Sequence, residues 1–256
     1  MNNRNSGLKR DDETMDTLFH GSLSILQKKK GYRFSVDSPL LAHFATLRKG
    51  ERVVDLGTGS GVIAMILALR FPETKIAEVE IQQELADMAE RNIALNGLGD
   101  RIRVHPGDVK GIRETFAPKS FDAAVFNPPY RRLNSGKINP NYERAVARHE
   151  ITGTIDDFLA AARYLLKDYG RAYVIYPASR GVQLIAGMRR HGMEPKKIRI
   201  VYSDSLSGAV FILAEGVKGA GEEVEIMPPL FIYGSDGGYS DEMDRMLGGA
   251  SLAIPS

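Results

Sequence analysis

Short apolar segments alternate with longer amphipathic ones through the middle of the chain. RVVDL at 52–56, KIAEVE at 75–80 and FDAAVF at 121–126 have the length and composition of buried strands. VIAMILALRF at 62–71 and QQELADMAERNIALN at 82–96 carry apolar residues at helical spacing. Strands that alternate with helices in this order predict a parallel sheet, covered by helices on both faces and joined by right-handed crossovers.

The same alternation continues to about residue 215. It predicts further strands at RIRVH, GRAYVIYP, EPKKIRIVYS and SGAVFILAEG, and further helices at VKGIRETF, TIDDFLAAARYLL and ASRGVQLIAGMRRHG. The last two strands follow each other without a helix, which favours an antiparallel pair. We therefore expect an α/β fold with a mostly parallel seven-stranded sheet whose final strand is antiparallel.

The two ends of the chain have different patterns. Residues 1–14 are almost entirely polar and charged, and we expect them to be disordered. FSVDSPLLAHF at 34–44 predicts a lead-in helix with Asp37 or Ser38 as its cap and Pro39 in its first turn. The glycine-rich residues 216–256 predict an extension with one or two short extended pieces. The predicted organisation is thus an N-terminal extension at 1–50, a main domain at 51–215 and a C-terminal extension at 216–256.

Composition narrows the possible chemistry. The 256 residues contain no cysteine, which excludes disulfides, thiolate metal sites and cysteine nucleophiles. No apolar run reaches the roughly 18 residues of a membrane span, and the start of the chain lacks the apolar middle of a signal peptide. We therefore expect a cytoplasmic protein without a membrane or metal partner. The net charge of +2 is too small to identify a nucleic-acid partner by itself.

A glycine-rich loop, VVDLGTGSG at 53–61, joins the first predicted strand to the first helix of the main domain. Gly57, Gly59 and Gly61 allow a tight turn and a close approach of the backbone to a ligand, and the following helix offers free amide donors. The spacing differs from that of dinucleotide sites. Asp55, at the end of the strand, would repel a pyrophosphate but suits a cationic amino group. A turn without a ligand is the alternative.

Acidic residues also end the next two strands. Glu80 can accept hydrogen bonds from both hydroxyls of a ribose, and Asp108 can accept a hydrogen bond from an adenine amine. The apolar residues beside them, Ile81 and Val109, are expected to line the same pocket. Taken singly, Glu80 is typical of a surface glutamate and Asp108 of a cap for the helix VKGIRETF.

Together, these strand ends describe a pocket for an adenosine that lacks phosphates and carries an amino-acid tail, which is S-adenosylmethionine. Over roughly Arg52 to Glu215 the chain resembles the Rossmann-like S-adenosylmethionine-dependent methyltransferases. The resemblance implies S-adenosylmethionine as methyl donor and S-adenosylhomocysteine as product.

The fourth strand ends in the motif NPPY at 127–130. If the amide oxygen of Asn127 and the carbonyl of Pro128 accept the two hydrogens of an aromatic amine, its lone pair is directed at the methyl group. Pro129 stiffens the turn, and Tyr130 offers a stacking face for a base. The motif matches that of amino-methyltransferases acting on adenine, guanine or glutamine. The absence of cysteine excludes methylation of a pyrimidine ring carbon, which needs a thiolate.

The segments around LQKKKGYRFSVDSPLLAHF and ARHEITGT resemble bacterial tRNA adenine-amine methyltransferases that modify the anticodon loop of valine tRNA. That resemblance places Phe34 beside the cofactor, and it makes adenine N6 in tRNA the expected acceptor. Basic residues after the motif are candidates for binding the RNA backbone: Arg131, Arg132, Lys137, Arg144 and Arg148. A protein-glutamine N5 or rRNA guanine N2 methyltransferase, and a binding module without turnover, are the alternatives.

Overall fold

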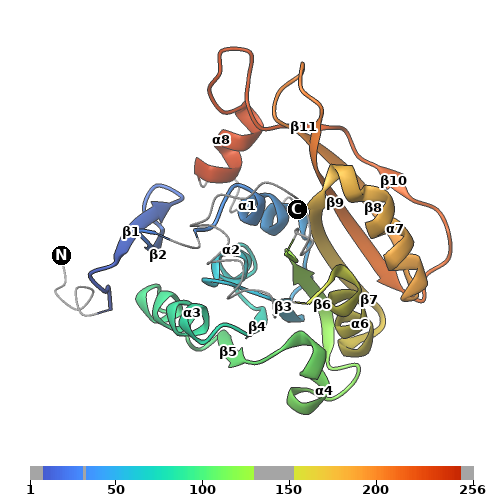
Figure 1. Cartoon of the computed structure of the whole chain (residues 1–256), viewed down its shortest axis with the longest axis horizontal. Coiled ribbons are helices and arrows are strands. Elements are labelled where there is room, and N and C mark those ends of the chain that lie inside the picture. The colour runs from blue at the N-terminus through green and yellow to red at the C-terminus, as the bar shows by residue number, and fades with distance from the viewer. Residues whose placement is uncertain (1–7, 31–32, 130–152, 249–256) are drawn as a thin grey trace.

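The computed structural model describes residues 8–30, 33–129 and 153–248. Their central feature is a nine-stranded sheet in the order β10-β8-β9-β7-β6-β3-β4-β5, with β11 also paired to β8 (Figure 1). Its strands are β3 (Arg52–Leu56), β4 (Lys75–Glu80), β5 (Ile102–Pro106), β6 (Phe121–Phe126), β7 (Leu166–Pro177), β8 (Met193–Tyr202), β9 (Ala209–Lys218), β10 (Glu225–Ile226) and β11 (Leu230–Phe231).

The directions of the strands agree with the predicted fold class. β5, β4, β3, β6 and β7 run parallel to one another. β9 lies between β7 and β8 and is antiparallel to both. The seven long strands are the seven that the sequence predicts, and the two-residue strands β10 and β11 add to the edge at β8.

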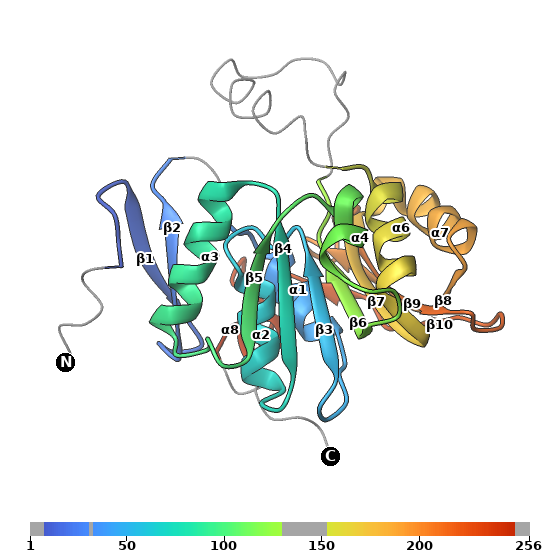
Figure 2. The same cartoon turned by 90° about the horizontal axis from the view of Figure 1, so that it is seen from below.

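Helices cover both faces of the sheet (Figure 2). Within the described residues they are α1 (Asp37–Phe44), α2 (Val62–Arg70), α3 (Gln83–Leu95), α4 (Ile112–Thr115), α6 (Ile155–Leu165), α7 (Gly181–Arg190) and α8 (Asp241–Gly248), with single 3₁₀ turns at Val109–Gly111 and Ala178–Arg180. Alternate strand residues face opposite layers, so that Val53 packs with α1 and α2 while Val54 packs with α6 and α7.

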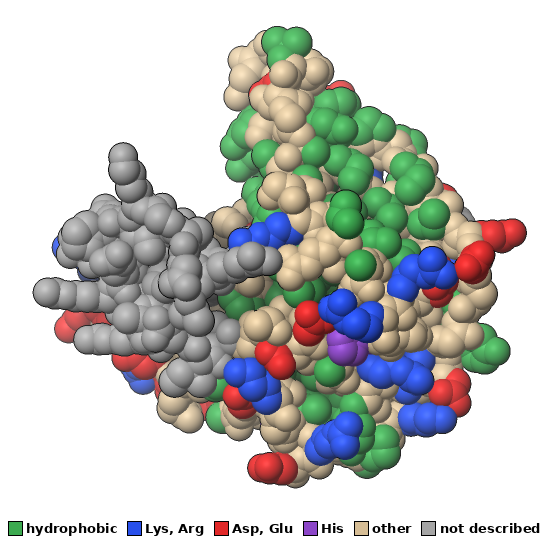
Figure 3. Space-filling model, turned by 45° about the vertical axis from the view of Figure 1, so that its right-hand side comes forward, with side chains coloured by type: hydrophobic (Ala, Val, Ile, Leu, Met, Phe, Trp, Pro, Cys, Tyr) green, Lys and Arg blue, Asp and Glu red, His purple; other side chains and the backbone are tan. Residues whose placement is uncertain are grey.

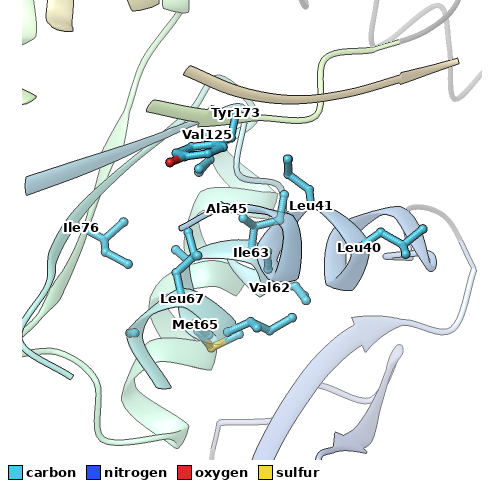
Figure 4. Packing of buried hydrophobic residues seen from close by; sticks show 14 of the residues in the cluster. Leu40, Leu41, Ala45, Val62, Ile63, Met65, Leu67, Ile76, Val125 and Tyr173 are labelled. Carbon is cyan, nitrogen blue, oxygen red and sulfur yellow. The ribbon is translucent and has the colours of Figure 1, made fainter. Parts of the chain in front are cut away.

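The α2 helix is buried around its whole circumference from Val62 to Ala68. Figure 4 shows the reason: Leu41 and Ala45 lie on one side of α2, and Ile76 and Val125 of the strands lie on the other. Each fully buried aliphatic side chain contributes about 1.5 to 3 kcal/mol of transfer free energy. This packing fixes α2, and with it the glycine-rich loop from which the helix starts.

An antiparallel hairpin precedes α1, where the sequence predicts only a lead-in helix. Its strands are β1 (Glu13–Leu18) and β2 (Leu23–Lys28). The expectation of disorder over 1–14 is therefore wrong for residues 8–14, and residues 1–7 lie outside the described residues. The α1 helix is present as predicted, but neither Asp37 nor Ser38 is its cap, because the N-cap position is Val36 and carries no side-chain cap bond.

The hairpin is fixed to α3 by a buried ion pair. Glu13 has no exposed surface, and its two carboxylate oxygens each accept a hydrogen bond of 2.7 Å from Arg91. Removing one partner of such a pair leaves a buried charge without compensation. The buried charged side chain at the start of β1 thus helps to dock the hairpin on α3.

We expect Arg91→Ala to lower the free energy of unfolding by about 3 kcal/mol, because Glu13 then remains buried and unpaired. Urea denaturation of the wild type and the variant measures this difference. Lys49→Ala is the control, since Lys49 forms an exposed ion pair with Glu73 and its loss should leave stability nearly unchanged. Equal stabilities of the Arg91 variant and the wild type would show that the pair does not hold the hairpin.

The C-terminal extension begins later and is more ordered than the sequence suggests. β9 continues through Lys218, beyond the predicted boundary at 215, and two short strands, β10 and β11, follow where one or two short extended pieces were predicted. Helix α8 was not predicted. Its Met243 is fully buried in the same core as α1, and the carbonyl of Leu247 accepts a hydrogen bond of 3.2 Å from the amide of Phe19. Residues 216–248 therefore belong to the main body of the fold.

Candidate active site

Four neighbouring parallel strands, β5, β4, β3 and β6, bring the predicted site residues to one edge of the sheet. Asp55 lies one residue before the end of β3, Glu80 ends β4, and Asn127 directly follows β6. Asp108 comes two residues after β5. Ligands of open α/β sheets bind at the carboxyl ends of the strands, so this edge is the candidate active site.

The loop from β3 to α2 needs glycine at the positions that the sequence singles out. Gly57, Gly59 and Gly61 all have positive φ angles, of 71°, 62° and 85°. A Cβ at Gly57 would lie 3.1 Å from the ring of Phe158, and one at Gly61 would lie 3.1 Å from the carboxylate of Glu78. The loop thus packs against α6 through Phe158 and against β4 through Glu78, and these contacts hold its backbone in place.

Asp55 is completely buried under this loop. Its Oδ2 accepts a hydrogen bond of 2.7 Å from Thr58, while its Oδ1 has no hydrogen-bond partner among the described residues. Burial is the main cause that raises the pKa of Asp55 to about 7, and the negative charge of Glu80 acts in the same direction. A buried carboxyl with an unused oxygen suits a cationic ligand group.

Glu80 is hydrogen-bonded to the backbone of the glycine-rich loop. Its two oxygens accept hydrogen bonds of 2.9 Å from the backbone amides of Gly59 and Gln82. Each carboxylate oxygen has a second lone pair, which leaves acceptors for the two hydroxyls of a ribose. Burial raises the pKa of Glu80 above its ordinary value. Ile81, which follows it, is partly exposed at the same edge.

Asp108 has the structural role that the sequence allowed as an alternative. Its Oδ1 accepts a hydrogen bond of 2.9 Å from the amide of Lys110 and caps the 3₁₀ turn. The residue is partly exposed at the end of β5, and the neighbouring Val109 is buried. Contact of either residue with an adenine stays a prediction.

Glu78 is a further candidate site residue, which the sequence analysis missed. It is fully buried, and neither of its carboxylate oxygens has a hydrogen-bond partner among the described residues. It lies beside Asp55 in the register of β3 and β4. Burial and the charge of Asp55 raise its pKa well above its ordinary value. Its spacing of two from Glu80 in KIAEVE, on the same face of the strand, was the available signal.

Asn127 is oriented by a second residue that the sequence analysis gave another role. Its Nδ2 donates a hydrogen bond of 3.0 Å to Oδ2 of Asp37, which lies in the first turn of α1. Oδ1 of Asp37 in turn accepts from the hydroxyl of Ser35 at 2.6 Å and from the amide of Ser38 at 2.9 Å. Because the amide nitrogen of Asn127 faces Asp37, its oxygen is directed elsewhere. This is the orientation that an acceptor of amine hydrogens requires.

The rest of the motif is described only in part. Pro128 is buried and Pro129 is exposed directly after Asn127. Tyr130 and the predicted RNA-binding residues Arg131, Arg132, Lys137, Arg144 and Arg148 lie outside the described residues. Phe34 is partly buried, and its amide donates a hydrogen bond of 3.1 Å to Oε1 of Gln27 in β2.

Within the described residues, basic side chains also gather near Lys28 and near Lys197, and acidic groups pair with most of them. Lys28 and Arg33 form ion pairs with Asp12 and Asp16 of the N-terminal segment. Lys197 and Arg199 form ion pairs with Glu225 and Glu242. Figure 3 likewise shows blue and red side chains interspersed over one face of the molecule. Among the residues described here, no group of three or more metal-binding side chains gathers, and no helix is long and apolar enough to cross a membrane.

The raised pKa of Asp55 predicts a pH dependence of stability. The folded protein keeps this proton up to a pH of about 7, whereas the unfolded chain loses it near pH 4. The free energy of unfolding should therefore fall as the pH rises through this interval, by up to about 1.4 kcal/mol per pH unit from this group. The comparison is urea denaturation of the ligand-free wild type and Asp55→Asn at several pH values. Parallel curves for the two proteins would contradict the assignment.

Comparison with known proteins shows which protein family the chain is similar to. The family model of the methyltransferase small domain matches residues 34–191. A tRNA1(Val) (adenine(37)-N6)-methyltransferase from Vibrio campbellii is 29% identical over 224 residues, which are 87% of this chain and 90% of that protein. The enzyme of the same name from Vibrio vulnificus strain YJ016 is 30% identical over 66% of this chain and 69% of its own length.

Solved structures show the same fold. A predicted O-methyltransferase from Agrobacterium tumefaciens superposes with a TM-score of 0.70 at 20% identity, over 86% of this chain and 98% of that one. TrmN from Thermus thermophilus superposes with a TM-score of 0.51 at 22% identity, over 71% of this chain and 48% of that one. These structures are similar in fold, and at such identities the likeness concerns the fold alone.

Proposed function

Because the chain belongs to the methyltransferase small domain family, we propose that it transfers a methyl group from S-adenosylmethionine to the N6 amine of an adenine in tRNA. The observation that carries this proposal is the placement of Asn127. The amide follows β6 at the same sheet edge as the glycine-rich loop, and Asp37 turns its oxygen away from α1. The names of the relatives make adenine 37 of a valine tRNA the first position to test.

The residues at the strand ends fit the methyl donor. Asp55 has a buried, unused carboxylate oxygen for the donor's cationic amino group, and Glu80 has lone pairs for its ribose hydroxyls. The positive φ angles of the loop glycines bring the backbone close to the ligand without an intervening Cβ. S-adenosylmethionine supplies a methyl group that its sulfonium already activates.

The acceptor side then requires only orientation. The amide oxygen of Asn127 and the carbonyl of Pro128 accept the two hydrogens of the adenine amine, which directs the nitrogen lone pair toward the methyl group. No base has to remove a proton before transfer, since the cationic product amine loses one afterwards. Catalysis is thus mainly alignment of two reactants in one site.

The acceptor is identified by a survey of substrates. The protein is incubated with methyl-labelled S-adenosylmethionine and, separately, with total tRNA, total rRNA and total protein, and labelled RNA is digested to nucleosides. We expect label in tRNA as N6-methyladenosine, and an adenine in tRNA also implies a cytoplasmic location. Label in protein alone would favour glutamine as acceptor, label in rRNA guanine would favour a guanine N2 enzyme, and donor binding without transfer would favour a binding module.

A further inference from the structure

Asn92 in the last turn of α3 and Asn96, which caps the end of this helix, bind the backbone of β2 as a neighbouring strand would. Oδ1 of Asn92 accepts from the amide of Leu26 at 2.7 Å, and its Nδ2 donates to the carbonyl of Leu26 at 3.2 Å. Asn96 makes the same pair of hydrogen bonds with Ser24, at 2.9 and 2.7 Å. Four helical residues rise about 6 Å and two strand residues about 6.7 Å, so the two spacings match.

Only one of the two asparagines also reaches the glycine-rich loop. Nδ2 of Asn92 donates a second hydrogen bond, of 2.9 Å, to the carbonyl of Ser60. Asn92 is fully buried, and these bonds use its oxygen and both of its amide hydrogens. Asn96 is partly exposed, and its remaining contacts are the carbonyl of Asn92 and the sulfur of Met65.

The loop is therefore held at consecutive residues by two elements. Glu80 accepts from the amide of Gly59, and Asn92 donates to the carbonyl of Ser60. The contact through Asn92 also involves the hairpin, because the side-chain amide of Asn92 is hydrogen-bonded to the backbone of Leu26 in β2. The same strand contacts the predicted cofactor residue Phe34 through Gln27. β2 thus connects the loop with the segment that leads into α1.

We propose that Asn92 is a positioning residue that couples docking of the β1–β2 hairpin to the shape of the glycine-rich loop, and hence to binding of the methyl donor. The coupling to donor binding rests on the function proposed above. Losing Asn92 leaves the carbonyl of Ser60 and both backbone groups of Leu26 without this partner. Because coupling between two sites is reciprocal, ligand bound at the loop should stabilise the hairpin.

The test compares Asn92→Ala with Asn96→Ala, since both variants lose hydrogen bonds to β2 and only the first loses the bond to the loop. Calorimetry should show binding of S-adenosylhomocysteine about tenfold weaker for Asn92→Ala and within twofold of the wild type for Asn96→Ala. Hydrogen exchange should show that this ligand protects the Leu26 amide in the wild type and protects it less in Asn92→Ala. Asn92→Ser, which leaves room for a water at the same place, replaces the alanine variant if that one does not fold.

The outcomes separate this inference from the proposed function. Wild-type affinity in Asn92→Ala, or an equal loss in Asn96→Ala, would overturn the coupling and leave Asn92 a role in stability alone. If the wild type itself binds no S-adenosylhomocysteine, the proposed function fails. The coupling is then decided by hydrogen exchange of the ligand-free proteins. Faster exchange at Gly59 and Gly61 in the Asn92 variant than in the Asn96 variant supports it, and equal rates overturn it.

Discussion

An Asn127→Ala variant should bind S-adenosylhomocysteine with nearly wild-type affinity and yet transfer methyl groups about 10²- to 10³-fold more slowly. The amide oxygen of Asn127 is the group proposed to accept a hydrogen of the acceptor amine, and alanine offers none. The residue takes part in no described hydrogen bond with the glycine-rich loop, so its loss leaves the donor-binding strand ends in place. Single-turnover transfer to unmodified tRNA measures the rate, and calorimetry measures the affinity.

Asp37→Ala is the companion to this variant. It keeps the side-chain amide of Asn127 but removes the carboxylate that orients this amide through the hydrogen bond of 3.0 Å from Nδ2 to Oδ2 of Asp37. We expect a smaller loss of turnover, of about tenfold, because the amide can then rotate into unproductive orientations. An unchanged rate in Asn127→Ala would remove the proposed role of the amide. A loss in Asp37→Ala accompanied by an equal loss of affinity would show that Asp37 acts on the donor site instead.

The second large effect is expected for Asp55→Ala, which should weaken binding of S-adenosylhomocysteine by about 100-fold. The variant removes the buried carboxylate whose unused oxygen suits the ligand's amino group. The loss should be larger at pH 8 than at pH 6. The reason is that the pKa of Asp55 is about 7, and only the ionised carboxylate attracts the cation. Calorimetry at the two pH values measures both effects.

A control variant separates the direct contact of Asp55 with the ligand from the effect of removing any negative charge in this region. Glu84 is exposed in the first turn of α3, and Glu84→Ala removes one negative charge without touching the loop. Its affinity should equal that of the wild type. If Glu84→Ala weakens binding as much as Asp55→Ala, the net charge of this region and not the buried carboxylate would account for the affinity.

The alternation of apolar and amphipathic segments was sufficient to predict the central sheet. RVVDL, KIAEVE and FDAAVF are strands with the predicted limits, because each is a short segment with apolar residues that stands between loops and a longer amphipathic helix. The hairpin was missed for the opposite reason. In β1 the fully buried residue is Glu13, and the arginine that compensates its charge lies far along the chain in α3. A local pattern cannot show that a charged residue is buried.

The parts of the candidate site that could be predicted are those where the residue type has one structural use, as glycine has at positive φ angles. Positive φ angles at Gly57, Gly59 and Gly61 agree with the spacing of the loop. Residues with two possible roles were harder to interpret. Asp37 was expected to cap a helix and instead orients Asn127. For Asp108 both a cap and a ligand contact were open, and the structure shows the cap of a 3₁₀ turn while the contact stays a prediction. Which carboxylate serves which purpose depends on distances between segments far apart in sequence.

The hydrogen bond between the amide of Phe19 and the carbonyl of Leu247 has a consequence for biosynthesis. It joins the N-terminal hairpin to the last described helix, and Met243 of that helix completes the core over α1. A nascent chain can therefore not finish this layer until residues 241–248 have left the ribosome. Until then its apolar face stays open to solvent and to chaperones. Removal of α8 would leave this apolar face open in the finished protein as well.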